Sequence, residues 1–195
     1  MSECEDLCEH TDHAPLSSTW KLWFNTKARG SSYCGDPSII GGWACAFKMW
    51  HWLLPKELQP GELPLGTGLY IFKSGIAPSW EDPMNANGGR WTISMTSGSD
   101  ALWPLICMGV AGLTLGPSIT GIIVLKRKNY TRISVWTTSK TDDDTNLEIG
   151  TTLKKYMTEA GVVMRVLNQR KPLTKVPPLE YQDHGADYDK FRHVL

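Results

Sequence analysis

The sequence predicts an α+β fold, in which helices cover one face of an antiparallel sheet. Several segments, such as residues 90–95, alternate apolar and polar side chains, which is typical of half-buried strands. Two more, residues 119–127 and 131–138, lie close together and indicate a hairpin. Residues 43–54 and 142–161 instead repeat apolar side chains at helical spacing. Alternating strands suit a sheet that is buried on one side, so we expect the helices on that side.

The elements of the N-terminal half follow from local patterns. We expect residues 1–14 to form a flexible acidic tail that precedes one domain at residues 15–168. Residues 20–27 alternate and predict a strand, and the Gly/Ser-rich residues 28–42 predict a loop. The helical spacing of residues 43–54 predicts a helix that Pro55 stops.

The elements of the C-terminal half follow in the same way. Residues 68–73 predict a short strand, and Asp100 can cap a helix that ends near Val110. The helix that follows Asp142 is expected to end at Gly161, before a last strand at residues 162–167. Residues 169–195 are rich in proline and charge, which predicts a partly irregular C-terminal tail.

Composition excludes several classes of function. Formal net charge is zero, and the first 19 residues contain only acidic charges, so residues 20–195 have a small basic excess. That excess argues against a general nucleic-acid coat but allows a patch for a few phosphates. We see no signal peptide and no apolar run long enough to span a membrane. Five cysteines without framework spacing predict free thiols, and we expect a cytoplasmic protein, with nuclear location left open.

The cysteines and histidines of the N-terminal tail raise the question of a metal site. Cys4, Cys8, His10 and His13 crowd this segment. Their spacing is too cramped for a familiar closed tetrahedral zinc site. We therefore predict no metal and no cofactor.

The loop at residues 76–82 offers an indole, Trp80, next to a carboxylate, Glu81. Pro78 and Pro83 mark the segment as a loop. A flat ring that stacks on the indole could present edge N–H groups to the carboxylate, and guanine has both N1–H and N2–H₂ on one edge. The alternative is that Trp80 packs in the core and Glu81 is solvated.

The predicted hairpin carries a second group of candidates. Arg132, Ser134 and Trp136 share one face of a strand, with about 13 Å between the outer two. Arg127 lies across the turn from Arg132. The arginine fork suits phosphate, so an indole and two guanidiniums fit the shape of a nucleotide. The alternative is that both arginines are solvated turn residues.

These motifs together resemble a known family, the eukaryotic translation initiation factor 4E family. The resemblance rests on residues 72–82, on Gly88-Gly89-Arg90-Trp91, and on Arg127, Arg132 and Trp136, which occur in family order. It implies a curved antiparallel sheet of about eight strands with three helices on the convex face. It also implies that the concave face binds the 7-methylguanosine cap of mRNA.

The resemblance assigns roles to individual residues. It implies that Trp80 is one stacking ring, that Glu81 accepts from the guanine edge, and that Trp136 touches the N7-methyl group. Tyr33 falls at the other stacking ring, where the family usually has Trp, and Trp23 or Trp43 is the alternative. The implied phosphate ligands are Arg127, Arg132 and Arg90. A third basic position falls on Asn129, which departs from the family pattern.

The resemblance also implies protein partners. Trp50 looks like the exposed helix residue that receives a partner helix with a tyrosine–leucine motif; the alternative is a core tryptophan. Other implied partner positions are Ala46, Pro104, Leu105 and Pro15, and their residue types depart from the usual ones.

Three functional classes are compatible with these observations. The first is a monomeric factor that binds the cap and recruits a scaffold partner of the 4G type, or a 4E-binding regulatory protein, in translation initiation. The second is a cap-binding repressor with a different partner. The third is an enzyme acting on capped nucleotides, which we do not expect because no glycine-rich phosphate loop or glutamate-rich metal helix is visible.

Overall fold

The computed structural model describes residues 15–25, 37–45, 55–111, 114–166, 177–186 and 190–195. An eight-stranded sheet forms its centre, in the order β2-β1-β3-β5-β6-β4-β7-β8, with antiparallel pairing throughout. The strands are β1 Pro15–Asn25, β2 Ser38–Cys45, β3 Gly68–Lys73, β4 Gly89–Met95, β5 Ile119–Lys126, β6 Thr131–Thr137, β7 Leu179–Asp183 and β8 His193–Val194. The α+β prediction, with its curved antiparallel sheet, is confirmed.

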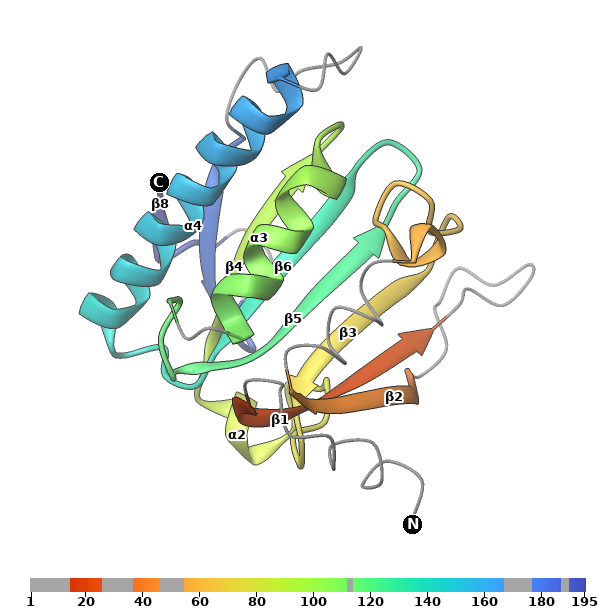
Figure 1. Cartoon of the computed structure of the whole chain (residues 1–195). Coiled ribbons are helices and arrows are strands. Elements are labelled where there is room, and N and C mark those ends of the chain that lie inside the picture. Colours follow the sequence, from red (N-terminus) through yellow and green to blue (C-terminus); the bar gives the residue numbers. More distant parts are fainter. Residues whose placement is uncertain (1–14, 26–36, 46–54, 112–113, 167–176, 187–189) are drawn as a thin grey trace.

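The helices of the described residues are the 3₁₀ turn η1 Lys56–Leu58, the short α2 Pro83–Ala86, α3 Ser99–Ala111 and α4 Asp143–Val166. Figure 1 shows that α3 and α4 lie together on one face of the sheet. We call this the covered face, and the opposite side the open face. None of these helices combines the length and apolarity that a membrane span requires.

The main core lies between the sheet and these two helices. Alternate strand residues point into it because side chains on a strand change face at every residue. The larger members, all buried, are Trp20, Leu22, Leu69, Ile71, Trp91, Ile93, Ile122, Val124, Ile133 and Val135 from the sheet, Leu102, Trp103 and Ile106 from α3, and Ile149, Leu153 and Met157 from α4. The residues between them in sequence therefore lie on the open face.

The N-terminal prediction is wrong for residues 37–45. Trp43 pairs with Trp20 in β2, where a loop followed by a helix was expected, and residues 46–54 lie outside the described residues. The Gly41-Gly42 pair suggested a loop, but a Cβ atom on Gly42 would come within 2.9 Å of the carbonyl oxygen of Trp20. The glycine is thus explained by close strand approach.

The predicted end of the last long helix is also wrong. Helix α4 continues through Gly161 to Val166, so the strand expected at residues 162–167 does not form in the described residues. Ala160 and Gly161 are buried, which shows that this end of the helix still packs against its surroundings. Tertiary packing here outweighs the strand preference of the consecutive valines and the helix-breaking tendency of glycine.

Two strands come from the segment expected to be a partly irregular tail. Strand β7 pairs with β4, and β8 pairs with β7. Arg192 fastens this edge with two hydrogen bonds to the carboxylate of Asp183, at 2.9 and 2.6 Å. Leu195 exchanges backbone hydrogen bonds with Leu179. The high charge of this segment made its strands hard to recognise in the sequence. Two of the charged residues, Asp183 and Arg192, form an ion pair at the edge of the sheet.

Tyr181 supplies a test of this edge. Its buried ring packs against Trp91, with centroids 5.1 Å apart, and its hydroxyl bonds to that of Thr137 at 2.8 Å. Burial raises the pKa of Tyr181 to about 12, so the folded protein keeps a proton that the unfolded chain loses near pH 10. The wild type therefore loses stability as pH rises from about 10 toward 12.

We expect Tyr181→Phe to lower the free energy of unfolding by about 1 kcal/mol at pH 8, because it removes the hydroxyl hydrogen bond. The gap to the wild type should narrow at pH 10.5, since the variant has no buried phenol to ionise. Urea denaturation of both proteins at the two pH values measures this. A gap that stays constant would contradict the proposed ionisation.

Candidate functional site

The loop that carries Trp80 is fixed at both ends by one aspartate. Asp82 caps α2, where its Oδ1 accepts a hydrogen bond from the backbone N–H of Met84 at 2.9 Å. Its Oδ2 accepts from the backbone N–H of Ala77 at 2.8 Å. Pro83 occupies the first position of the helix, where a missing N–H costs nothing. The residues between Ala77 and Asp82 therefore form a closed turn.

A buried amide supports the inside of this turn. Asn85 is 0% exposed, and its Nδ2 donates to the carbonyl oxygens of Ala77 and Ser79, at 2.9 and 2.8 Å. Both acceptors belong to the residues that lead into Trp80. Asn85 therefore holds the backbone of this turn from the inside. The side chains of Trp80 and Glu81, which follow Ser79, are exposed.

Trp80 is 55% exposed, so it is not a core residue. The exposed carboxylate of Glu81 accepts hydrogen bonds from the Ser79 hydroxyl and from the indole Nε1–H of Trp80. The bond from Ser79 is the main reason that the pKa of Glu81 lies below its ordinary value. At neutral pH the loop thus presents an ionised, purely accepting carboxylate beside a flat apolar ring.

Trp136 lies on the open face between two other rings. It is only 5% exposed, and Phe72 contacts it edge-on with centroids 5.4 Å apart. On the other side lies His184, at 4.2 Å between ring centroids. Gly121 is the residue paired with Phe72 and with Trp136, and a Cβ atom there would be 2.4 Å from the Phe72 ring. The missing side chain lets Phe72 lie across β5 and reach Trp136.

Arginines lie along the same face. Arg90 is paired with Trp136 between β4 and β6, and its Nη2 donates to Oε1 of Gln182 at 2.9 Å. Arg132 is at the other end of β6, with its guanidinium carbon 5.5 Å from the centre of the Tyr130 ring. Arg127 closes the β5–β6 turn through a 2.9 Å hydrogen bond from its backbone N–H to the carbonyl oxygen of Tyr130.

The predicted site residues of the N-terminal part fall partly inside and partly outside the described residues. Tyr33, Ala46 and Trp50 lie outside the described residues. Pro15 is the first residue of β1, paired with Cys45 in β2. The alternative stacking residues Trp23 and Trp43 lie in β1 and β2, so both belong to the half of the sheet away from Arg90.

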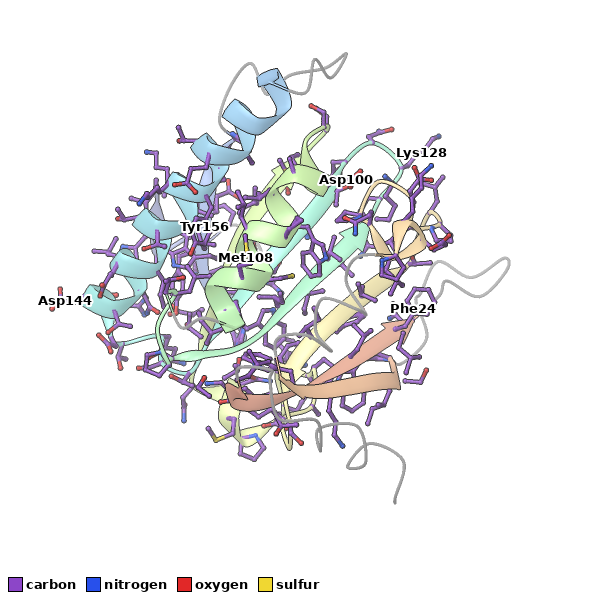
Figure 2. All side chains as sticks on the ribbon, in the orientation of Figure 1. Phe24, Asp100, Met108, Lys128, Asp144 and Tyr156 are labelled. Carbon is purple, nitrogen blue, oxygen red and sulfur yellow. The ribbon has the colours of Figure 1, made fainter. Side chains whose placement is uncertain are left out.

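The outer side of α3 carries the remaining predicted partner positions. Pro104 and Leu105 are half-buried, and Met108, one turn further, is 43% exposed. Figure 2 shows Met108 on the helix, away from the sheet.

Met108 was missed because the sequence pattern of α3 is apolar on all sides. His184 and Asn85 were missed because one histidine or asparagine in a polar segment gives no local signal.

Fold and site together define a class of α+β protein, in which one antiparallel sheet is covered by helices on one face. Its open face carries aromatic and guanidinium groups, and the loop before α2 carries an indole–carboxylate pair. The sequence matches the family described as Eukaryotic initiation factor 4E over residues 15–188. Eukaryotic translation initiation factor 4E-1 of Caenorhabditis elegans is 32% identical over 189 residues, which cover 93% of this chain and 85% of the relative. The chain therefore belongs to the eukaryotic initiation factor 4E family.

Solved structures agree with this assignment. One is the complex of C. elegans eIF4E-3 with the 4E-binding protein Mextli and a cap analog, with a TM-score of 0.78 and 28% identity. The matched region covers 94% of this chain and 100% of the eIF4E-3 chain. A second is Ascaris suum eIF4E-3 with the m7G cap, with a TM-score of 0.77, 27% identity, and coverage of 94% and 98%.

We expect Asn85→Ala to loosen the Trp80 loop, because it removes two hydrogen bonds from inside the turn. The free energy of unfolding should fall by about 1–2 kcal/mol. Hydrogen exchange of the amides in residues 77–86 should also accelerate. The exposed Asn87 gives a matched control, since Asn87→Ala removes an amide that has no role inside the turn. Equal effects of the two substitutions would contradict the role of Asn85.

Proposed function

We propose that this protein binds the 7-methylguanosine cap of mRNA on its open sheet face and recruits a scaffold protein to start translation. One observation carries the proposal: an exposed indole, Trp80, is hydrogen-bonded to an ionised carboxylate, Glu81, on a loop fixed from inside. A guanine that stacks on this indole can turn its N1–H and N2–H₂ groups toward the carboxylate. Relatives solved with a cap analog or the m7G cap support the choice of ligand.

Positive charge on the base explains a preference for the methylated form. A 7-methylguanine ring is cationic, and a cation over an indole gains about 2 kcal/mol when desolvated, in addition to about 1–3 kcal/mol for stacking. In this proposal Trp80 is one stacking ring and Tyr33 the other, with Trp23 or Trp43 as alternatives. Trp136 then contacts the N7-methyl group.

Phosphate binding is assigned to the arginines of the open face. Arg127 and Arg132 flank the β5–β6 turn, and Arg90 lies beside Trp136 on the neighbouring strand. A base held near Trp136 would direct its phosphates along β6 toward Arg132. Asn129 replaces a third basic residue, so the proposed site binds the triphosphate with fewer charges than is usual in the family.

The partner surface is assigned to the outer side of α3 together with Trp50. Half-buried Pro104 and Leu105, and exposed Met108, offer apolar contact on this surface. The apolar face of an amphipathic partner helix could dock against such a surface. The relative solved with the 4E-binding protein Mextli supports a partner of this kind. We propose initiation as the role, because no observed feature favours the repressor.

Two further points complete the proposal. The protein acts as a binding factor without enzymatic activity, since the role given to Glu81 is recognition of the base. Its place of action is the cytoplasm, where capped mRNA is translated.

Binding of 7-methyl-GTP and GTP, followed by quenching of tryptophan fluorescence, tests the ligand. We expect about 30-fold tighter binding of 7-methyl-GTP, which corresponds to the cation–indole term of about 2 kcal/mol. Glu81→Gln should weaken 7-methyl-GTP binding by about 10- to 100-fold, because the N1–H and N2–H₂ edge of the base loses its charged acceptor. Glu148→Gln, on the exposed side of α4, should change nothing. Equal affinity of the wild type for both nucleotides would refute the proposed ligand.

Partner binding can be separated from cap binding by two opposite variants. We expect Trp50→Ala to lose a peptide with the tyrosine–leucine motif while it stays on cap resin, and Trp80→Ala to do the reverse. Met108→Glu gives a second test, because it places a charge on an exposed part of α3 without disturbing the core. Peptide binding measured by calorimetry reports the result. If Trp50→Ala unfolds the protein, Trp50 belongs to the core instead.

A further inference from the structure

His184, the residue after β7, connects Trp136 on the open face with Asn85, which supports the Trp80 loop. Its ring contacts Trp136, with centroids 4.2 Å apart and planes tilted by 52°. Its Nδ1 lies 2.7 Å from the backbone carbonyl oxygen of Asn85. Its backbone N–H donates to the carbonyl oxygen of Gly88 at 3.0 Å. Residues almost one hundred positions apart in sequence are thus joined through one side chain.

The hydrogen bond to Asn85 fixes the state of the ring. A carbonyl oxygen can only accept, so Nδ1 must donate, and in the neutral ring Nε2 is then an acceptor. That Nε2 is buried and has no hydrogen-bond partner among the described residues, and the same holds for Nε1 of Trp136. The histidine is 9% exposed. The ring is therefore held by one strong contact on its Nδ1 side and by packing against the indole on its face.

Electrostatics agree with a neutral ring. Burial lowers the pKa of His184, and the nearby Arg90 and Lys140 lower it further, while the Asn85 carbonyl and Asp183 act in the opposite direction. At neutral pH His184 then adds no positive charge beside Trp136. A charged imidazolium here would repel a cationic base that contacts the same indole.

We propose that His184 is a positioning residue that sets the preference of the site for a methylated, cationic purine by holding Trp136 in place. The inference rests on the proposed function and deepens it. Phe72 supports the indole on one side and His184 on the other. Loss of the histidine ring lets Trp136 tilt away from the N7 position. Loss of the Nδ1 bond instead loosens the Trp80 loop, through Asn85.

Two substitutions separate these roles. His184→Asn places an amide near the Nδ1 position, so it retains a donor for the Asn85 carbonyl oxygen but removes the ring. His184→Phe retains a ring against Trp136 but removes the donor. We expect His184→Asn to lower the affinity ratio of 7-methyl-GTP to GTP by about 3- to 10-fold, the range for a lost aromatic pair. His184→Phe should weaken both nucleotides by about 3-fold and keep their ratio.

The experiment measures both affinities for the wild type, the two variants and His193→Asn, a control histidine that bonds to Asp143 beyond the site. Thermal unfolding confirms that each protein is folded. A wild-type ratio in His184→Asn would overturn the role of His184 and leave the proposed function intact. A wild type that does not discriminate between the two nucleotides would overturn both.

A second measurement needs no variant of His184. In the wild type, the Trp136 indole N–H resonance, assigned with Trp136→Phe, should shift along the titration curve of the His184 ring. The titration is carried out without nucleotide, so that no ligand group titrates in the same range. An indole resonance that does not follow His184 would overturn the proposal even if His184→Asn failed to fold.

Discussion

The register between β4 and β6 is the constraint on which the rest of the structure depends. With Trp91 opposite Val135, both side chains enter the covered face and pack beneath α3 and α4. The same register places Arg90 opposite Trp136 on the open face. A slip of β6 by one residue against β4 would turn Arg132 toward the core and Ile133 and Val135 toward the open face. By burying one face of the sheet, the helices therefore also determine which side chains lie on the open face.

This coupling explains which parts of the fold could be predicted from the sequence. Residues 90–95 and 131–136 alternate in sequence because one face is apolar, residues 68–73 and 119–126 form short apolar runs, and the structure contains all four strands. Strand β2 was missed because its glycines carry no side chain to reveal a face. Strand β7 was missed because its pairing partner, β4, lies far away in the sequence, and β8 in turn pairs with β7. The local sequence pattern shows which side chains are buried. It gives no signal where close backbone approach, or pairing with a strand that is distant in sequence, determines the structure.

The candidate site divides in the same way. Trp80, Glu81, Arg132 and Trp136 were predicted as site residues from the chemistry of their side chains, and the structure places Arg132 and Trp136 on one face of β6. The residues that support them could not be identified. Asn85 and His184 have ordinary surroundings in sequence, and their importance appears only when the loop, β6 and the end of β7 come together. Residues whose side chains have ligand-binding chemistry can be proposed from a sequence, whereas the residues that hold them in place become apparent only in the structure.

The bare backbone at Gly121 has a consequence for how this protein can diversify. Phe72 occupies the space that a side chain at position 121 would need, and the same ring braces Trp136. Any residue larger than glycine at 121 therefore requires a smaller one at 72, and the indole then loses its support. Positions 72, 121 and 136 can thus change only in concert, so a homologue that varies at one of them is expected to carry a compensating change at another.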